Sequence, residues 1–271
     1  MIPESWIRAI ILGTLQGLTE FLPISSSAHL LALPWLAGWE PGGLTFDTLL
    51  HGGTLIALIL YFREPLVRLI QGFLSPASAT GEWGRLGLPL LTGTLPILVA
   101  GATLTFLDVE RLRAPGLTCF NLAFFGLLLW RADGTQNKRT GLRSLTALQG
   151  FWIGLAQALA LMPGVSRSGV TMTAALLLGL GRPQAARFAF LLGIPAISMA
   201  IGAKLLELSV SPAQPSAWVS GEFVLGVLAA FLSGLLSIRF LLRFLENHTV
   251  KPFVFYRLVL SLVLLGWLLD Q

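Results

Sequence analysis

Long apolar segments are the feature of this chain that most limits its fold. A helix needs roughly 17 residues or more to cross a bilayer, and six segments are that long. Only 11% of the 271 residues are charged while 55% are hydrophobic, and a soluble core of this size cannot bury so much apolar surface. The sequence therefore predicts an all-α, polytopic membrane bundle with six transmembrane helices, within 45–62, 86–107, 115–131, 184–207, 220–244 and 252–269.

Four further apolar segments are shorter, and a proline separates the members of each of two pairs. Pro23 interrupts the first pair and Pro163 the second. Proline removes a backbone donor and clashes with the preceding helical turn, so each pair is expected to form a re-entrant helical hairpin with its tip at membrane depth. The paired segments are 5–21 with 25–37, and 146–161 with 167–180.

The two pairs resemble each other at a spacing of 141 residues. Three spans follow each pair, so we predict a single membrane domain over 1–271 with two repeats, 1–131 and 142–271, joined by a polar linker at 132–141. A hairpin adds no net crossing and three spans are an odd number, so the second repeat is expected to have inverted topology. The matching residues are Gly13 and Gly154, Gln16 and Gln157, Leu18 and Leu159, Ser25 and Ser166, and Ser27 and Ser168.

Lys and Arg are unevenly distributed between the two sides of this predicted bundle. Twelve fall on the side of the linker and four on the other, and the positive-inside rule makes the richer side cytoplasmic. Both termini are therefore expected to face outward. The basic residues are scattered in short loops, so the net charge of +5 does not indicate nucleic-acid binding. The twelve are Arg63, Arg68, Arg85, Arg131, Lys138, Arg139, Arg143, Arg182, Arg187, Arg239, Arg243 and Lys251, and the four are Arg8, Arg111, Arg113 and Lys204.

The first broken pair carries polar groups that are costly at membrane depth and are therefore functional candidates. Gln16 and Glu20 lie four residues apart, on one helix face. The serines beyond the break could simply cap the second half-helix, but capping does not account for Glu20 or His29. The polar residues of this pair are Gln16, Glu20, Ser25, Ser26, Ser27 and His29.

The second broken pair carries an arginine where a half-helix begins. Arg167 needs an anion at this depth, and its guanidinium matches a phosphate in bidentate fashion. Free N–H groups and the helix dipole favour the same negative charge. The alternative is an ion pair of Arg167 with Glu20 that locks the hairpins together, and both interpretations can hold in the substrate-free protein. Hydroxyls beside the arginine come from Ser166, Ser168, Thr171 and Thr173.

Together the two tips supply what phosphoryl transfer needs: charge stabilisation, a positioned hydroxyl and a proton donor or acceptor. Other polar residues are given supporting roles. Asp47 and His51 share a helix face and are expected to support the site or line its entry. Cys119, the single cysteine, lies in an apolar run and is expected to be structural. Solvated ion pairs are expected in the loop that holds Asp108, Glu110, Arg111 and Arg113.

Two stretches resemble the signatures of the undecaprenyl-diphosphate phosphatase family known for bacitracin resistance. The first is Gln16-Gly-Leu-Thr-Glu20-Phe-Leu-Pro-Ile-Ser25-Ser26-Ser27-Ala-His29, and the second is Pro163-Gly164-Val-Ser166-Arg167-Ser168-Gly169-Val-Thr171. The resemblance covers nearly the whole chain. It implies a bacterial inner-membrane enzyme with a site open to the periplasm. Such an enzyme cleaves the terminal phosphate of undecaprenyl diphosphate, which recycles the cell-wall lipid carrier and confers bacitracin resistance.

The resemblance also implies roles for single residues. It makes Glu20 the essential carboxylate, Ser26 the nucleophile, His29 the general acid or base, and Arg167 the phosphate clamp. The helix break exposes Ser26 beside the predicted phosphate site, although a water activated by His29 or Glu20 is the alternative to Ser26. The predicted substrate-binding residues are Gln16, Ser25, Ser27, Ser166, Ser168 and Thr171.

A divalent cation, Mg²⁺ or Ca²⁺, is a further implication of the resemblance. Many members of the family have Glu where this chain has Gln16, which removes one charge from a metal site formed with Glu20. A single carboxylate binds a divalent ion weakly, so the cation is expected to arrive with the diphosphate oxygens.

The strongest alternative is a lipid-phosphate flippase, because half-helices meeting at the midplane are typical of transporters. A membrane scaffold would leave the buried Arg and Glu unexplained. The Pro-Ser-Gly-His motif of another lipid phosphatase class is absent from the sequence. The predicted partners are the bilayer and a polyprenyl diphosphate lipid, and a homodimer is one arrangement that the sequence allows.

Overall fold

The computed structural model of the protein describes residues 3–39, 43–74, 83–104, 114–135, 140–210 and 221–270. Within these ranges the chain forms eleven α-helices, three short 3-10 helices and no β-strand. The charged loop at 108–113 and two basic residues of the linker, Lys138 and Arg139, lie outside them. The helices are α1 (Glu4–Phe21), α2 (Ser26–Ala37), α3 (Gly43–Tyr61), α4 (Arg63–Leu74), η2 (Gly84–Leu86), α5 (Gly87–Leu104), α6 (Pro115–Asp133), η4 (Leu142–Ser144), α7 (Ala147–Ala158), η5 (Leu159–Leu161), α8 (Arg167–Leu177), α9 (Arg182–Val210), α10 (Gly221–Asn247) and α11 (Lys251–Leu269).

Four stretches of the described chain are long and apolar enough to cross a membrane. They coincide with four of the six predicted spans, and α3 and α6, with 19 residues each, occupy the other two. The protein is therefore a multi-pass helical membrane bundle, while the number of crossings stays a prediction. The four stretches are Gly84–Thr103, Arg182–Ser209, Gly221–Asn247 and Lys251–Leu269.

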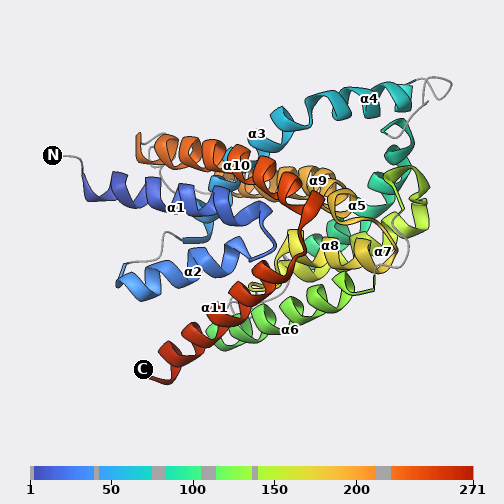
Figure 1. Ribbon diagram of the computed structural model, residues 1–271. Helices are drawn as coiled ribbons and strands as arrows, with labels where there is room; N and C mark the ends of the chain where they lie inside the picture. The colour runs from blue at the N-terminus through green and yellow to red at the C-terminus, as the bar shows by residue number, and fades with distance from the viewer. Residues whose placement is uncertain are drawn as a thin grey trace.

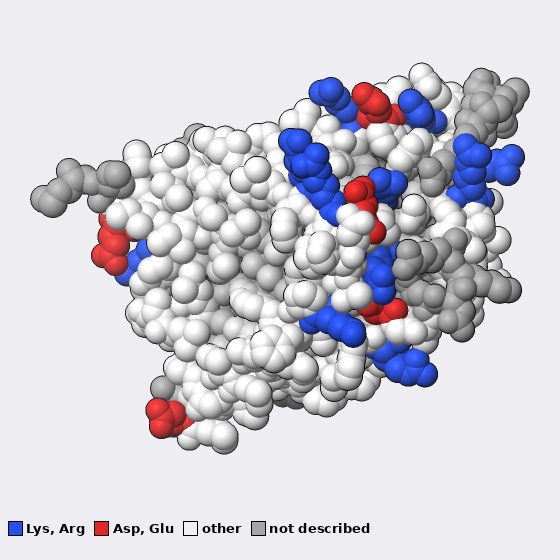
Figure 2. Space-filling model, viewed as in Figure 1, with Lys and Arg blue, Asp and Glu red and all other residues white. Residues whose placement is uncertain are grey.

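Charge is distributed along the bundle axis. Both chain ends lie at the same end of the bundle in Figure 1. Figure 2 shows that the Lys and Arg side chains of the visible face gather toward the opposite end, beyond a broad band without charge. An uncharged band between two polar ends is what a bilayer requires of a protein surface.

Each predicted helix break is present in the described structure. Leu22–Ser25 separates α1 from α2, and Met162–Ser166 separates η5 from α8. Ser25 and Ser166 directly precede α2 and α8. Their φ angles are 74° and 71°, the two positive values among the described non-glycine residues. Non-glycine residues seldom adopt this conformation, and it persists only where the surroundings enforce it.

The half-helices before the breaks are fixed by close backbone packing against long spans. A Cβ on Gly13 of α1 would lie 2.0 Å from the Gly226 carbonyl oxygen of α10. A Cβ on Gly154 of α7 would likewise lie 1.9 Å from the Gly93 oxygen of α5. Only glycine permits such an approach, so α1 and α7 are held rigidly and their C-terminal ends are fixed in place.

Replacing Gly13 by Ala should therefore lower the stability of the bundle, since the added methyl group forces α1 away from α10. Overpacking of this kind costs about 1–3 kcal/mol, which would lower the melting temperature in detergent by a few degrees. Gly266→Ala in α11 is the matched control, because a Cβ there meets no atom within 4 Å. Equal melting temperatures for the two variants would contradict the proposed packing.

Candidate active site

The two helix breaks cross-link each other through serines at equivalent positions of the predicted repeat. Ser168 Oγ donates to the Leu22 carbonyl of the first break over 3.1 Å. The Gly164 amide of the second break donates to Ser27 Oγ over 3.5 Å. Each break thus supplies a polar partner to the other, and the two tips form one unit.

Arg257 of α11 joins both tips from behind. Its side chain is fully buried. The guanidinium donates to the Pro23 carbonyl of the first break over 3.4 Å, and to the carbonyls of Gly164 and Val165 in the second over 2.9 and 3.1 Å. Two further bonds reach Asn121 and Leu122 of α6. One side chain therefore satisfies carbonyls that the breaks leave without helical partners.

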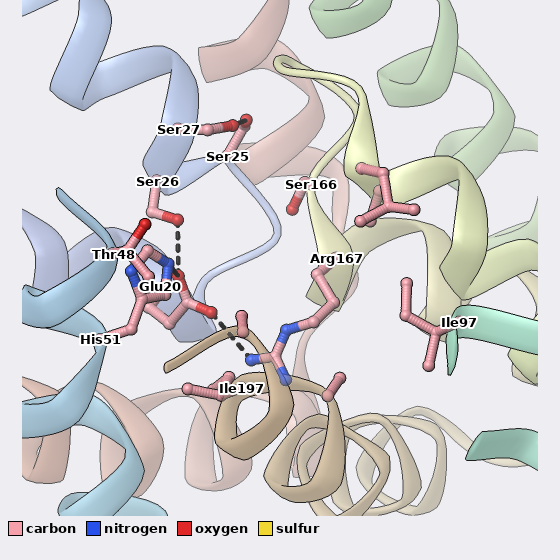
Figure 3. Close-up of a pocket in the computed structure, with 14 residues that line it drawn as sticks. Glu20, Ser25, Ser26, Ser27, Thr48, His51, Ile97, Ser166, Arg167 and Ile197 are labelled. Carbon is pink, nitrogen blue, oxygen red and sulfur yellow. Dashed lines mark hydrogen bonds and ion pairs between the residues drawn. The ribbon is translucent and has the colours of Figure 1, made fainter. Parts of the chain in front are cut away.

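A cavity opens in front of the tips, and Figure 3 shows side chains of both halves facing each other across it. The first half contributes Glu20, Ser25, Ser26, Ser27, Thr48 and His51, and the second half contributes Ser166 and Arg167. The remaining lining residues are apolar: Ile97, Ala160, Leu161, Ala196, Ile197 and Ala200.

Glu20 is the centre of the polar wall. Its Oε1 accepts from Arg167 Nη2 over 2.9 Å. Its Oε2 accepts from Ser26 Oγ over 2.6 Å and from Gln16 Nε2 over 3.0 Å, and it lies 3.3 Å from His51 Nε2. The dashed lines of Figure 3 mark the contacts of Glu20 with Ser26 and Arg167. One carboxylate thus connects a hydroxyl to a guanidinium.

Arg167 has hydrogen-bond donors that no protein group in the described structure uses. Its Nε and Nη1 are buried and have no hydrogen-bond partner among the described residues. The guanidinium lies against the backbone of Gly193 in α9, where any Cβ would overlap with Nη1. Buried donors without a partner are costly, so Arg167 is arranged to receive oxygens of an anion that enters the cavity.

The predicted substrate-binding residues divide into two groups. Ser25, Ser27 and Ser166 line the cavity. Ser168 and Thr171 do not line it, since Ser168 bonds to Leu22 and Thr171 Oγ1 bonds to the Arg167 carbonyl. Gln16 is also absent from the lining and contacts the site only through Glu20.

The two buried histidines differ in what surrounds their rings. Nδ1 of His29 lies 2.7 Å from the Ser25 carbonyl and Nε2 lies 2.7 Å from the Tyr256 hydroxyl. A carbonyl only accepts, so Nδ1 carries the proton and a neutral ring accepts from the tyrosine. His29 is thereby satisfied, and it does not line the cavity. Its predicted role as general acid or base finds no support in this geometry.

His51 faces acceptors on both sides. Its Nδ1 lies 2.8 Å from the Asp47 carbonyl, so this nitrogen also carries a proton. Its Nε2 faces the Glu20 carboxylate, which is an acceptor as well. A proton must lie between these two groups, because otherwise two lone pairs would face each other. His51 and Glu20 are therefore direct partners that share a proton, and the sequence analysis had given His51 only a supporting role.

The polar wall does not fit a cation held by the protein alone. The described residues contain no cluster of three His, Cys, Asp or Glu side chains that could bind a metal. Glu20 is the sole carboxylate among the residues that line the cavity, and both its oxygens already accept hydrogen bonds. The Gln16 Oε1 atom is buried without a partner among the described residues, but one amide oxygen does not make a metal site.

Three residues of the site were not predicted for the places they occupy. His51 and Thr48 reach the cavity from α3, and the sequence analysis assigned no role to Arg257. A lone arginine inside an apolar segment is a signal that could have identified Arg257. Gly193 gives no such signal, because its role depends on where the Arg167 side chain happens to pack.

Comparisons with known proteins agree over almost the full chain. A family model described as bacitracin resistance protein BacA matches residues 9–263. The undecaprenyl-diphosphatase of Chromohalobacter salexigens is 44% identical over 265 residues, which cover 97% of this chain and 98% of that protein. The undecaprenyl-diphosphatase of Saccharophagus degradans is 45% identical over 259 residues, covering 94% and 95%.

The histidine assignments can be tested by ¹⁵N NMR of histidine-labelled protein, because the chain contains only three histidines. At neutral pH we expect His51 to show two protonated nitrogens and His29 to show a proton on Nδ1 alone. His29→Gln and His51→Gln provide the assignments, and Glu20→Gln should remove the charge on His51. A neutral His51 in the parent protein would contradict the interpretation.

Proposed function

The chain belongs to the BacA family of bacitracin resistance proteins, and on this basis we infer that it is a membrane phosphatase that hydrolyses undecaprenyl diphosphate to undecaprenyl phosphate and phosphate. The observation in the site that best supports this activity is the bridge from Ser26 through Glu20 to Arg167. The proposed nucleophilic hydroxyl, its base and the guanidinium that would bind the phosphate thereby share one cavity.

We propose that Ser26 attacks the terminal phosphorus. The Ser26 hydroxyl donates to Glu20, so the carboxylate is placed to accept its proton as the Oγ–P bond forms. The bond from this phosphorus to the bridging oxygen breaks, and undecaprenyl phosphate leaves with the electron pair. Water then attacks the phosphoserine, its oxygen and both its protons leave on the released phosphate, and Glu20 returns the proton to Ser26 Oγ as the P–Oγ bond breaks. In the first step the cavity wall supplies both the nucleophile and the proton acceptor.

Arg167 would hold the transferred phosphoryl group. Two buried nitrogens of its guanidinium, Nε and Nη1, have no hydrogen-bond partner among the described residues and can donate to phosphate oxygens, and Ser25, Ser27 and Ser166 offer hydroxyls in the same cavity. Charge that develops on these oxygens is stabilised most strongly in a site that excludes water. On substrate binding, Arg167 would therefore exchange some of its hydrogen bonding to Glu20 for hydrogen bonds to the phosphate.

Proton transfer at the leaving phosphate is better assigned to His51 than to His29. His51 lines the cavity beside Glu20, whereas both ring nitrogens of His29 are engaged elsewhere. We assign to His29 the role of fixing the Ser25 carbonyl at the start of α2. Ser168 and Thr171 would then act by holding the tips in place.

We propose that a divalent cation, Mg²⁺ or Ca²⁺, enters with the diphosphate. Glu20 is already engaged on both oxygens and is surrounded by cationic donors, so the phosphate oxygens would have to supply the ligands. When bound, the cation would neutralise phosphate charge.

The finer architecture is also proposed: six crossings, two re-entrant hairpins and two inverted repeats over 1–131 and 142–271. Equivalent serines share one unusual backbone conformation, and equivalent glycines make the same type of contact with a long span. Both termini would lie in the periplasm, at the end of the bundle away from most visible Lys and Arg side chains (Figures 1 and 2).

Phosphate release from undecaprenyl diphosphate by the purified protein in detergent tests the function. We expect Ser26→Ala, Glu20→Gln and Arg167→Lys each to lower turnover at least about a hundredfold, since each removes one element of phosphoryl transfer. Ser144→Ala, an exposed hydroxyl away from the cavity, should stay at the parent rate. Near-normal turnover of Ser26→Ala would exclude Ser26 as the nucleophile and favour an activated water.

Chelation should stop phosphate release, yet the substrate-free protein should bind Mg²⁺ or Ca²⁺ only weakly, with a dissociation constant of about 1 mM or more. Calorimetric titration of the purified protein measures this affinity directly. Adding undecaprenyl phosphate should strengthen it, because the lipid brings oxygen ligands. Micromolar binding to the protein alone would mean that a metal site exists on the protein itself.

A further inference from the structure

The cavity has a second wall that the chemistry above does not use. Ile97 comes from α5, Ala160 and Leu161 come from η5, and Ala196, Ile197 and Ala200 come from α9. Figure 3 shows Ile97 on the far side of Arg167 from the group formed by Ser26, Glu20 and His51, and Ile197 below Glu20 and the Arg167 guanidinium. The apolar side chains offer no hydrogen bond to a phosphate, so this wall must face another part of the substrate.

The apolar wall reaches the surface of the protein. Ile97 and Ile197 are buried, whereas Ala200 is exposed although it also lines the cavity. The helices that meet there, α5 and α9, contain two of the four stretches best suited to cross a membrane. An opening between them therefore faces hydrocarbon.

Both helices also carry an internal proline at the level of this wall. α5 carries Pro96 directly before Ile97, and α9 carries Pro195 directly before Ala196. An internal proline removes a helical hydrogen bond and prevents close packing of the preceding turn. Both sides of the opening thus carry the same local defect.

The corresponding pair of helices on the other side of the bundle packs closely together and leaves no opening between its members. In the proposed repeat, α3 and α10 are the counterparts of α9 and α5. A Cβ on Gly53 of α3 would lie 2.2 Å from the Val227 oxygen of α10, and these helices touch along much of their length, whereas α5 and α9 touch over a shorter stretch. Both α5 and α9 contribute residues to the cavity wall, whereas α10 contributes none among the described residues.

We propose that the polyprenyl tail of the substrate leaves the cavity between α5 and α9, with its first isoprene units lying over Ala196 and Ala200. This assignment rests on the proposed function and adds to it the route of the lipid. The diphosphate binds at Glu20, Ser26 and Arg167, and the tail continues along the apolar wall into the bilayer. The small side chains of the two alanines, four residues apart on one face of α9, keep this passage open.

Filling the passage should impair use of the natural lipid. Ala196→Leu and Ala200→Leu should each lower kcat/KM for undecaprenyl diphosphate at least tenfold, mainly by raising KM, because the added branches occupy the volume of the first isoprene unit. Ser198→Leu is the matched control: it lies on the same helix, is exposed, and points roughly 200° away from both alanines. Unchanged kcat/KM in both alanine variants, or an equal loss in the control, would overturn the proposal.

A second measurement does not depend on catalysis. A thiol introduced by Ala200→Cys should react with N-ethylmaleimide, while the native Cys119 is buried. Undecaprenyl phosphate should slow this reaction at least fivefold and inorganic phosphate should not, since only the lipid carries a tail. The thiol introduced by Ser198→Cys should not be protected by either compound. Protection by neither compound, or by both equally, would exclude the tail from this passage.

The two measurements separate the route from the activity. A parent protein that releases no phosphate would refute the proposed function, and selective protection of the introduced thiol would still establish where a polyprenyl phosphate lies. A parent that hydrolyses the lipid while the thiol stays unprotected would retain the function and refute the route.

Discussion

The structure depends on satisfying backbone groups where two helices break at membrane depth. Water is absent from the bilayer core, so every carbonyl released by a break needs a partner inside the protein. Arg257 supplies partners for three of them from one guanidinium, and Ser27 and Ser168 each bond to the backbone of the opposite break. Only with the tips fixed in this way can Glu20, Ser26 and Arg167 meet across a cavity instead of packing into a core.

The sequence left two roles open for Arg167: an ion pair with Glu20 that locks the tips together, and a binding site for phosphate. In the substrate-free protein the ion pair locks the two halves, with Oε1 of Glu20 bonded to Arg167. Two nitrogens of the same guanidinium nevertheless have no hydrogen-bond partner in the described part of the chain, which a purely structural bridge would not require. A buried pair is costly to assemble, and its retention is accounted for if an incoming phosphate completes the hydrogen bonds of Arg167.

The sequence predicted the parts of the fold that depend on composition and local chemistry. Apolar runs identified the spans, prolines identified both breaks, and costly polar residues identified Glu20, Ser26 and Arg167 as a group. Contacts between distant segments were beyond it: that His29 is satisfied by Tyr256, that His51 reaches Glu20 from another helix, and that Gly193 accommodates Arg167. These depend on helix rotation and packing, which no periodicity in a single chain encodes.

The position of Arg257 along the chain bears on how the protein matures. Arg257 lies 234 residues after Pro23 and 93 after Gly164, so a ribosome delivers both tips to the membrane long before their common partner. Until α11 inserts, the tip carbonyls lack that guanidinium and the half-helices have no fixed alignment. The contacts by which Arg257 aligns the two tips therefore form only after α11 has joined the bundle.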